Sequence, residues 1–301
     1  MLPFLSEKQQ AVQGPFKMSE LNRFIKHPRK PRLFIGLFYV LFFCLGVWGS
    51  PLDARAQSPD NSKGDTVDLP YRYFVPKPLI QEKKKLSDSD LVSITQSGAV
   101  TKLIVFLHGS GERGSDNESQ LIHGQPFFEK LAQDNKALVL VPQCPKEKSW
   151  HKGYSTIRRG KKNYHYPKKI LPNDVLDALE ELIDYLSKGL KIPTKNIALG
   201  GLSMGGMGTL ELLRRRPGYY SRAFVICGGA HPIVARQIGP TPTWFFHGDR
   251  DPVVLPKYAK KLFKRLKSRG YESKMTIYPN VEHDSWDLAF KESELISWLN
   301  Q

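Results

Sequence analysis

The stretch Gly200-Gly201-Leu202-Ser203-Met204-Gly205-Gly206 decides how this chain is interpreted. Residues 195–199 before it predict a short buried strand, and residues 207–213 after it predict a helix. A Gly-x-Ser-x-Gly sequence between a strand and a helix is typical of a tight turn that presents its serine at the tip. The glycines leave room for the strand and the helix. Ser203 is therefore a predicted nucleophile, although a glycine-rich loop with a structural serine can give the same pattern.

A serine hydroxyl is a poor nucleophile at neutral pH, so it needs a base to accept its proton and an acid to orient that base. Two candidate acids, Asp249 and Asp251, follow an apolar run that ends at Phe246 and predicts a strand. His283 follows residues 274–278, which predict the last strand, and it is the candidate base. Spacing alone does not separate the two aspartates.

A tetrahedral intermediate of acyl transfer also needs two N–H donors aimed at its oxyanion. We expect one of them from the backbone of Met204, the residue after the serine. The other is expected from the loop at residues 108–114, which follows a buried strand at residues 101–107. Within that loop we assign the donor to Ser110, with Gly111 as the alternative.

The motifs around these residues resemble the α/β-hydrolase superfamily, over roughly residues 67–301. Within it, they are closest to the phospholipase/carboxylesterase and dienelactone-hydrolase-like esterases, and similar to modules related to polyhydroxybutyrate depolymerases and feruloyl esterases. In such esterases the acid is typically the aspartate before Pro-x-Val, so the resemblance implies Asp251 rather than Asp249. The motifs that carry it are Leu107-His108-Gly109-Ser110-Gly111-Glu112-Arg113-Gly114, Gly201-Leu202-Ser203-Met204-Gly205-Gly206, His247-Gly248-Asp249-Arg250-Asp251-Pro252-Val253-Val254 and His283-Asp284-Ser285-Trp286.

Strands that alternate with helices predict an α/β architecture: a doubly wound, mostly parallel sheet with helices on both faces. The resemblance implies that this is the α/β-hydrolase fold. Active sites of such sheets lie at the carboxyl ends of the strands, where the candidate residues fall. The predicted strands are residues 69–76 (an edge strand), 103–107, 137–141, 195–199, 222–227, 243–246 and 274–278, and the predicted helices include residues 127–133, 173–187 and 207–213.

The first 56 residues are predicted to lie outside the fold. A basic cluster at residues 26–32, an apolar run at residues 33–48 and an Ala-x-Ala sequence ending at Ala56 are the three parts of a secretory signal peptide. We therefore expect an exported protein, periplasmic or secreted, with a linker at residues 57–66 and a catalytic domain at residues 67–301. The alternative is a membrane anchor formed by residues 33–48, although this run is shorter than the about 20 residues that span a bilayer.

A long polar connection at residues 142–171 carries aromatic residues among basic ones, and connections of this length are usually functional or disordered. Together with Gly111, its Trp150 and His151 are candidates for contact with a substrate; the alternative is a solvated cap. The formal net charge of +16 favours an anionic surface or polymer, unless it is general surface charge. We expect no nucleic-acid partner, because the chain is predicted to be exported and shows no nucleic-acid-binding fold.

Other reactive side chains point to no cofactor. Cys144 and Cys227 follow predicted strands, and they could form a disulfide after export or remain two buried thiols. The remaining histidines lack the spacing of metal ligands, such as His-Glu-x-x-His, and no phosphate-binding loop occurs. We therefore expect neither a metal nor another cofactor.

Together these features predict an exported hydrolase that cleaves carboxylic esters through an acyl-enzyme on Ser203, with His283 as base and Asp251 as its partner. The expected substrate is a small-molecule or polymer-linked ester, and a membrane is a partner only if the N-terminal segment is uncleaved. One alternative is a serine peptidase of the prolyl-oligopeptidase type, which normally carries a β-propeller before this domain. Another is a binding protein with a hydrolase fold, which usually lacks one of the three residues.

Overall fold

The computed structural model of this chain describes residues 67, 69–77, 79, 86–159 and 161–301. The predicted signal peptide (residues 1–56), its apolar run at residues 33–48 and the predicted linker (residues 57–66) lie outside the described residues. Within the part of the chain that is described, no helix is both long enough and apolar enough to cross a membrane.

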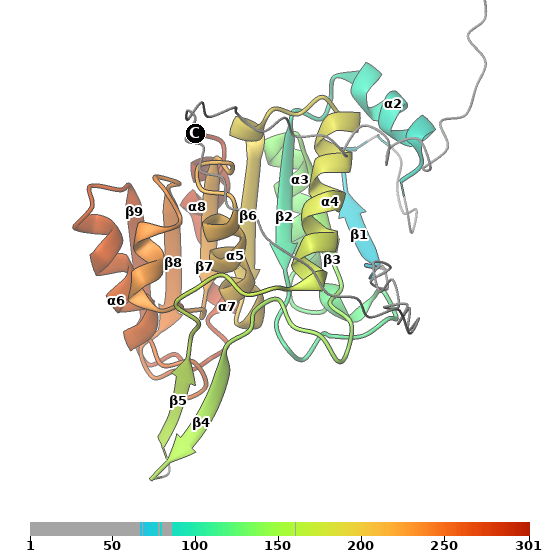
Figure 1. Cartoon of the computed structure of the whole chain (residues 1–301). Helices are drawn as coiled ribbons and strands as arrows, with labels where there is room; N and C mark the ends of the chain where they lie inside the picture. Colours follow the sequence, from blue (N-terminus) through green and yellow to red (C-terminus); the bar gives the residue numbers. More distant parts are fainter. Residues whose placement is uncertain (1–66, 68, 78, 80–85, 160) are drawn as a thin grey trace, which may run out of the picture. The chain divides into compact units, whose positions relative to one another are not determined.

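A seven-stranded central sheet organises residues 69–301 (Figure 1). Its strand order is β1-β3-β2-β6-β7-β8-β9, with β1 antiparallel to β3 and every other neighbouring pair parallel. Parallel neighbours need crossover connections, which the helices supply. The prediction of a doubly wound, mostly parallel sheet is confirmed. The strands are β1 (Tyr71–Phe74), β2 (Lys102–Leu107), β3 (Ala137–Pro142), β6 (Ile197–Leu202), β7 (Arg222–Ile226), β8 (Thr243–Gly248) and β9 (Ser273–Tyr278).

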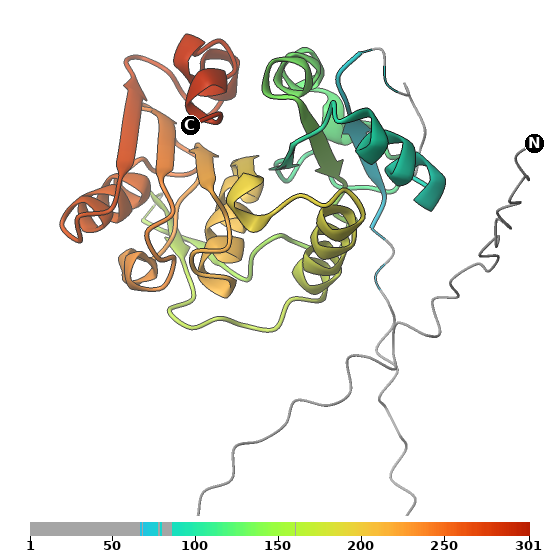
Figure 2. The same ribbon diagram turned by 90° about the horizontal axis from the view of Figure 1, so that it is seen from above.

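Helices cover both faces of this sheet (Figures 1 and 2). The main helices on one face are α4 (Asp174–Gly189), α5 (Met204–Arg215) and α6 (Lys257–Lys267), and those on the other are α3 (Gln125–Asn135) and α8 (Ser293–Trp298). The buried strands supply both cores: in β2, Leu103 and Val105 join one hydrophobic cluster, whereas Ile104 and Phe106 join the other. The shorter elements are α2 (Asp88–Ser97), α7 (Trp286–Ala289), η1 (Ser119–Leu121), η2 (Thr194–Asn196) and η3 (Pro232–Arg236).

The long connection at residues 142–171 contains regular structure that the sequence interpretation did not anticipate. Within it, β4 (Tyr154–Arg158) and β5 (Lys161–His165) pair antiparallel as a separate two-stranded sheet. This hairpin extends away from the central sheet (Figure 1). It is tied to α6, because the Tyr164 N–H donates a hydrogen bond to the Tyr258 hydroxyl at 3.0 Å. These two strands are additional to the strands that the sequence predicts.

Candidate active site

The turn between β6 and α5 consists of one residue, Ser203, whose backbone has φ 51° and ψ −115°. This conformation is strained for a residue with a Cβ atom and is typical of a serine presented at a sharp turn. The strand and helix approach too closely for side chains on either side of it. A Cβ on Gly205 would lie 1.9 Å from the Leu107 carbonyl oxygen, and a Cβ on Gly201 would lie 2.4 Å from the Gly205 carbonyl oxygen. Close approach therefore explains both glycines.

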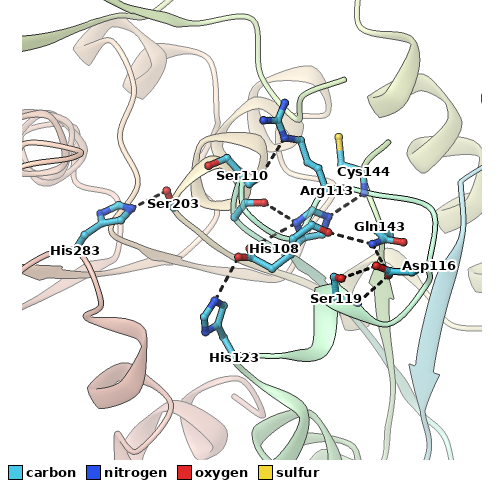
Figure 3. Close-up of polar contacts among 12 residues, drawn as sticks. His108, Ser110, Arg113, Asp116, Ser119, His123, Gln143, Cys144, Ser203 and His283 are labelled. Atoms are coloured by element: carbon cyan, nitrogen blue, oxygen red, sulfur yellow. Dashed lines mark hydrogen bonds and ion pairs between the residues drawn. The ribbon is translucent and has the colours of Figure 1, made fainter. Parts of the chain in front are cut away.

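The Ser203 hydroxyl contacts an imidazole that comes from near the end of the chain (Figure 3). Ser203 Oγ lies 2.9 Å from His283 Nε2, and His283 Nδ1 lies 2.8 Å from Asp251 Oδ2. His283 is in the loop after β9 and Asp251 is in the loop after β8. The three residues thus meet beyond the carboxyl ends of parallel strands, and they form a continuous hydrogen-bonded relay from carboxylate to hydroxyl.

The Asp251 carboxylate is buried among hydrogen-bond donors. Its Oδ1 accepts from the N–H groups of Val253 and Val254, at 2.8 and 2.9 Å, and its Oδ2 contacts both His283 and His247 Nε2, the latter at 3.0 Å. Burial alone would raise the pKa of Asp251, but the hydrogen bonds from His247 and His283 outweigh it and hold this pKa well below the ordinary carboxyl value. Asp251 is therefore an anion in the folded protein.

Asp249, the other candidate acid, has different partners. Its Oδ1 accepts a hydrogen bond from the Asn280 N–H at 2.8 Å, and its own N–H donates to the Tyr278 carbonyl at 3.0 Å. Asp249 is exposed and ties the turn after β8 to the end of β9. The structure thus brings Asp251, and not Asp249, to His283.

His247, near the end of β8, is a residue of the site that the sequence interpretation missed. Its fully buried Nε2 lies 2.7 Å from the Val254 carbonyl oxygen and 3.0 Å from the Asp251 carboxylate. Both partners are acceptors, so Nε2 carries the proton. Among the described residues, Nδ1 has no hydrogen-bond partner, and a second proton there would be buried and unpaired. His247 therefore supports Asp251 as a hydrogen-bond donor through Nε2.

The expected oxyanion donors lie around the serine. Met204 is the first residue of α5, and the first N–H groups of a helix have no acceptor within it. Ser110 and Gly111 lie in the exposed loop between β2 and η1. Gly109 brings this loop against the turn, because a Cβ built on it would lie 3.7 Å from the Ser203 Cβ.

A second carboxylate–imidazole pair, also missed at the level of sequence, joins Glu112 of the same loop to His123, which follows η1. The buried Glu112 has Oε1 3.3 Å from His123 Nε2 and Oε2 3.8 Å from His108 Nδ1. Burial would raise the pKa of Glu112, but the interactions with His108 and His123 hold it below the ordinary value. The His123 ring also packs on Trp286 at 5.0 Å, and Trp286 packs edge-on against His283 at 5.7 Å. This pair therefore shares an aromatic neighbour with the relay.

The two predicted substrate contacts in the long connection differ in position. Trp150 has no exposed surface, and its ring packs edge-on against His108 with centroids 5.5 Å apart. It belongs to the core behind the loop after β2, and in this structure it has no surface with which to contact a substrate. His151 is partly exposed, and burial lowers its pKa to about 4, so its ring is neutral near pH 7.

Other reactive groups are enclosed. Cys144 and Cys227 are both free and buried, which matches the buried-thiol alternative rather than a disulfide. Burial raises the pKa of Cys144 to about 12, and that of Cys227 well above its ordinary value, so neither thiol is activated as a nucleophile. Over residues 86–159 and 161–301 and the few described before them, no group of three or more His, Cys, Asp or Glu side chains could hold a metal ion.

Comparison with known proteins agrees with this architecture. The profile of the phospholipase/carboxylesterase family matches residues 90–294. Lysophospholipase-like protein 1 of Mus musculus is 25% identical over 211 residues, which cover 64% of this chain and 83% of that protein. Acyl-protein thioesterase 1 homolog 1 of Dictyostelium discoideum is 22% identical over 199 residues, which cover 60% of this chain and 83% of that protein.

A solved structure of a thermostable esterase is 31% identical, with a TM-score of 0.59. The alignment covers 80% of this chain and 60% of the esterase, so this chain spans about three fifths of that protein's length. The chain belongs to the phospholipase/carboxylesterase family and has the α/β-hydrolase fold.

Proposed function

We propose that this protein is an exported serine hydrolase that cleaves carboxylic esters through an acyl-enzyme on Ser203. The observation that carries the proposal is the relay in which Ser203 Oγ is 2.9 Å from His283 Nε2 and His283 Nδ1 is 2.8 Å from Asp251 Oδ2. A strained serine at a strand-to-helix turn adds support. Membership of a family that includes esterases and thioesterases makes acyl transfer the expected chemistry.

In the proposed reaction, His283 Nε2 takes the Ser203 proton as Oγ attacks the ester carbonyl carbon. The tetrahedral intermediate collapses when the bond to the leaving oxygen breaks, and the imidazolium gives its proton to the departing alcohol. The acyl group stays on Oγ. A water molecule then attacks this ester while His283 accepts its proton, and collapse of the second intermediate releases the acid and returns the proton to Ser203.

Asp251 has two tasks in this mechanism. Its Oδ2 accepts a hydrogen bond from the Nδ1–H of His283, which leaves the lone pair of Nε2 directed at Ser203. Its negative charge also stabilises the imidazolium that forms during attack. The two backbone N–H groups on Oδ1 and the His247 contact on Oδ2 fix the carboxylate in place, which makes His247 a positioning residue in this proposal.

The oxyanion would bind the N–H of Met204 together with the N–H of Ser110, with Gly111 as the alternative to Ser110. Electrostatic stabilisation by such donors acts on charge that develops in the transition state, so it lowers the barrier rather than tightening substrate binding. Gly111 and His151 remain our candidates for contact with the rest of the substrate.

The proposed substrate is a small-molecule or polymer-linked carboxylic ester, without a metal or other cofactor. The known relatives are named as an esterase, a thioesterase and a lysophospholipase-like protein, and thioesters follow the same acyl chemistry. Peptide hydrolysis and a binding role without catalysis are the alternatives. An intact relay argues against the second of these, because a binding protein has no need to maintain it.

Export is the part of the proposal that rests on sequence alone. The basic cluster, the apolar run at residues 33–48 and the Ala-x-Ala before Gln57 support a cleaved signal peptide. Sequencing the N-terminus of the protein recovered from its native host would test this. A mature protein that begins at Gln57 is expected, whereas an intact N-terminus in the membrane fraction would favour the anchor.

Catalysis is tested with a fluorophosphonate probe and aryl esters of graded acyl length. We expect the probe to label the wild-type protein and the variant Ser268→Ala, which changes an exposed serine at the end of α6. We expect Ser203→Ala to abolish labelling and to reduce ester hydrolysis by ~10³-fold or more. Equal labelling of the Ser203→Ala variant would reject the assignment of the nucleophile. Cleavage of peptides and not of esters would favour the peptidase.

A further inference from the structure

The loop between β2 and η1 is held by side chains that bind its carbonyl groups (Figure 3). The Gly109 carbonyl oxygen lies 2.6 Å from His108 Nδ1. The next carbonyl, that of Ser110, accepts a hydrogen bond from Arg113 Nε at 2.9 Å. Two successive peptide groups of this loop therefore have their oxygens fixed by a cationic or polar side chain of the same loop.

The proton of His108 can be assigned from its second contact. Its Nε2 lies 2.9 Å from the backbone N of Cys144, which is a donor, so Nε2 is the acceptor. Nδ1 then carries the proton and donates to the Gly109 carbonyl. His108 is buried, so this arrangement does not compete with solvent.

A trans peptide group is planar, and its C=O and N–H point in opposite directions. If the Gly109 carbonyl faces the His108 ring, then the Ser110 N–H faces away from that ring. If the Ser110 carbonyl faces Arg113, then the Gly111 N–H faces away from Arg113. Among the hydrogen bonds of the described residues, neither of these N–H groups has a partner.

The loop that presents these N–H groups is beside the reactive serine. A Cβ on Gly109 would lie 3.7 Å from the Ser203 Cβ and 2.8 Å from the Leu202 side chain. The His108 ring contacts Trp150 and the backbone of Cys144, which follows β3, whereas Ser203 follows β6 on the other side of β2. The Ser110 N–H, which faces away from His108, is therefore directed toward the side where Ser203 lies. The Gly111 N–H faces away from Arg113, whose guanidinium binds the Lys148 carbonyl after β3, so it is directed toward the same side.

Arg113 is itself fixed by contacts from outside the loop. Its Nη1 donates to the Lys148 carbonyl at 3.2 Å. The backbone on either side of it is also held, because Gln143 Nε2 donates to the Glu112 carbonyl at 3.1 Å and the Gly114 N–H donates to the Cys144 carbonyl at 3.0 Å. The guanidinium thus connects the Ser110 peptide to the segment after β3. This connection is present without a substrate.

We infer that Arg113 is a positioning residue for the oxyanion site: by binding the Ser110 carbonyl, it holds the Ser110–Gly111 peptide so that the Gly111 N–H is directed at a substrate oxyanion. His108 does the same for the Gly109–Ser110 peptide and the Ser110 N–H. This inference rests on the proposed acyl-transfer function. It also assigns a role to both alternatives for the second donor, because His108 orients the Ser110 N–H and Arg113 orients the Gly111 N–H.

The test compares Arg113→Gln and Arg113→Lys with Arg222→Gln. Arg222 forms an ion pair with Glu272 at the start of β7, and its guanidinium lies 4.8 Å from the Trp298 ring, so its loss affects stability at the opposite end of the sheet. The assays are steady-state hydrolysis of an aryl ester, inhibition by a short alkyl trifluoromethyl ketone, and thermal unfolding. The ketone forms a hemiketal oxyanion on the serine, so its affinity reports the donors directly.

For Arg113→Gln we expect kcat to fall by roughly 10- to 100-fold, less than the 10²–10³-fold that is typical of removing an oxyanion donor itself. KM should stay within about twofold, and affinity for the ketone should fall by about the same factor as kcat. Arg113→Lys, which keeps a cationic donor group, should recover part of both losses. Arg222→Gln should leave kcat and ketone affinity unchanged.

Two results would overturn the inference. One is an Arg113→Gln protein that matches wild-type kcat. The other is a fall in kcat that leaves affinity for the ketone intact, since that result places the effect elsewhere in the reaction. If Arg113→Gln does not fold, the same two criteria apply to Arg113→Lys. Failure of the proposed function is distinguishable, because the wild-type protein itself would then neither react with a fluorophosphonate nor hydrolyse the ester.

Discussion

The substitution Asp251→Asn tests the relay most directly, because it changes one oxygen for an NH₂ group at the centre of four contacts. In the wild-type protein, Oδ1 accepts two backbone N–H groups, and Oδ2 contacts His283 Nδ1 and His247 Nε2. An asparagine can keep its oxygen on only one of these two sides. The backbone donors are fixed, so we expect the NH₂ group to face the imidazoles.

That arrangement forces a change in His283. An NH₂ group needs an acceptor, so Nδ1 would lose its proton and Nε2 would gain one, which then faces the Ser203 hydroxyl. The imidazole can no longer accept the serine proton. The corresponding change in a chymotrypsin-type triad costs ~10⁴-fold in kcat, which equals about 5.4 kcal/mol of activation free energy. We expect a loss of this order in kcat and in kcat/KM.

Asp249→Asn is the matched control, because it removes the same charge two residues away. Asp249 contacts the Asn280 N–H through Oδ1, and an amide oxygen can accept the same bond. Its effect on kcat/KM should therefore be no more than about threefold, in the range of surface substitutions. The assay is aryl-ester hydrolysis at the pH of maximal activity, with the rate of fluorophosphonate labelling as an independent readout. The reasoning is refuted if Asp249→Asn is the inactive variant, or if Asp251→Asn keeps more than about a tenth of wild-type activity.

Four further predictions concern stability and pH. The pKa of Asp251 is lower in the folded protein than in the unfolded chain, so the unfolded chain binds the proton first as pH falls, and wild type loses stability. The difference in free energy of unfolding between wild type and Asp251→Asn, measured with urea, should therefore shrink below about pH 4. Ester hydrolysis should rise from acid to neutral pH, as the base must be unprotonated, and a chelator such as EDTA should not alter it. Gly205→Ala should lower the free energy of unfolding by about 3 kcal/mol or more, because its Cβ would lie 1.9 Å from the Leu107 carbonyl oxygen; an unchanged urea midpoint would contradict this. Ser203→Gly should be more stable than Ser203→Ala by about 1 kcal/mol, since only glycine adopts φ 51° with ψ −115° without strain, and equal melting temperatures would argue against backbone strain.

The fold was predictable because its signals are local. Strands such as β2 and β3 are continuous apolar runs, as expected for strands buried on both faces, and the helices between them show their own periodicity. The glycines around Ser203 report a close approach of strand and helix that any chain with this turn must make.

The choice between Asp249 and Asp251 was not predictable from spacing, because both lie in one turn and the partner of each is some 30 residues away. His247 and the Glu112–His123 pair were missed for the same reason. A histidine within an apolar strand gives no indication that a carboxylate will lie 3.0 Å from its Nε2. Such pairs depend on tertiary contacts that a periodic pattern does not encode.

The hairpin of β4 and β5 shows a different limit. All residues of β4 are exposed, and β4 lacks the alternation of apolar and polar residues that marks a half-buried strand. Its structure comes from pairing between the two strands, from the stacking of Tyr154 on His165, and from the bond between Tyr164 and Tyr258. The composition of this segment, rich in basic residues, gave no sign of the five residue pairs that join β4 to β5.

The strained backbone of Ser203 and the buried carboxylate of Asp251 are both needed to hold the relay in place. A backbone at φ 51° and ψ −115° persists only if its surroundings fix it, and the Ser203 N–H bond to the Ile226 carbonyl at 2.9 Å, together with the Met207 N–H bond to the Ser203 carbonyl at 3.0 Å, does so. The side chain is thereby held at the edge of the sheet. His283 can meet it there only if its own loop is held in place. Asp249 and Arg250 bind the backbone of that loop, and the ionised Asp251, which follows the adjacent β8, binds the His283 ring itself. The free energy that burial of this charge costs is offset by four donors, so the same contacts that make Asp251 an anion make the geometry of the relay rigid.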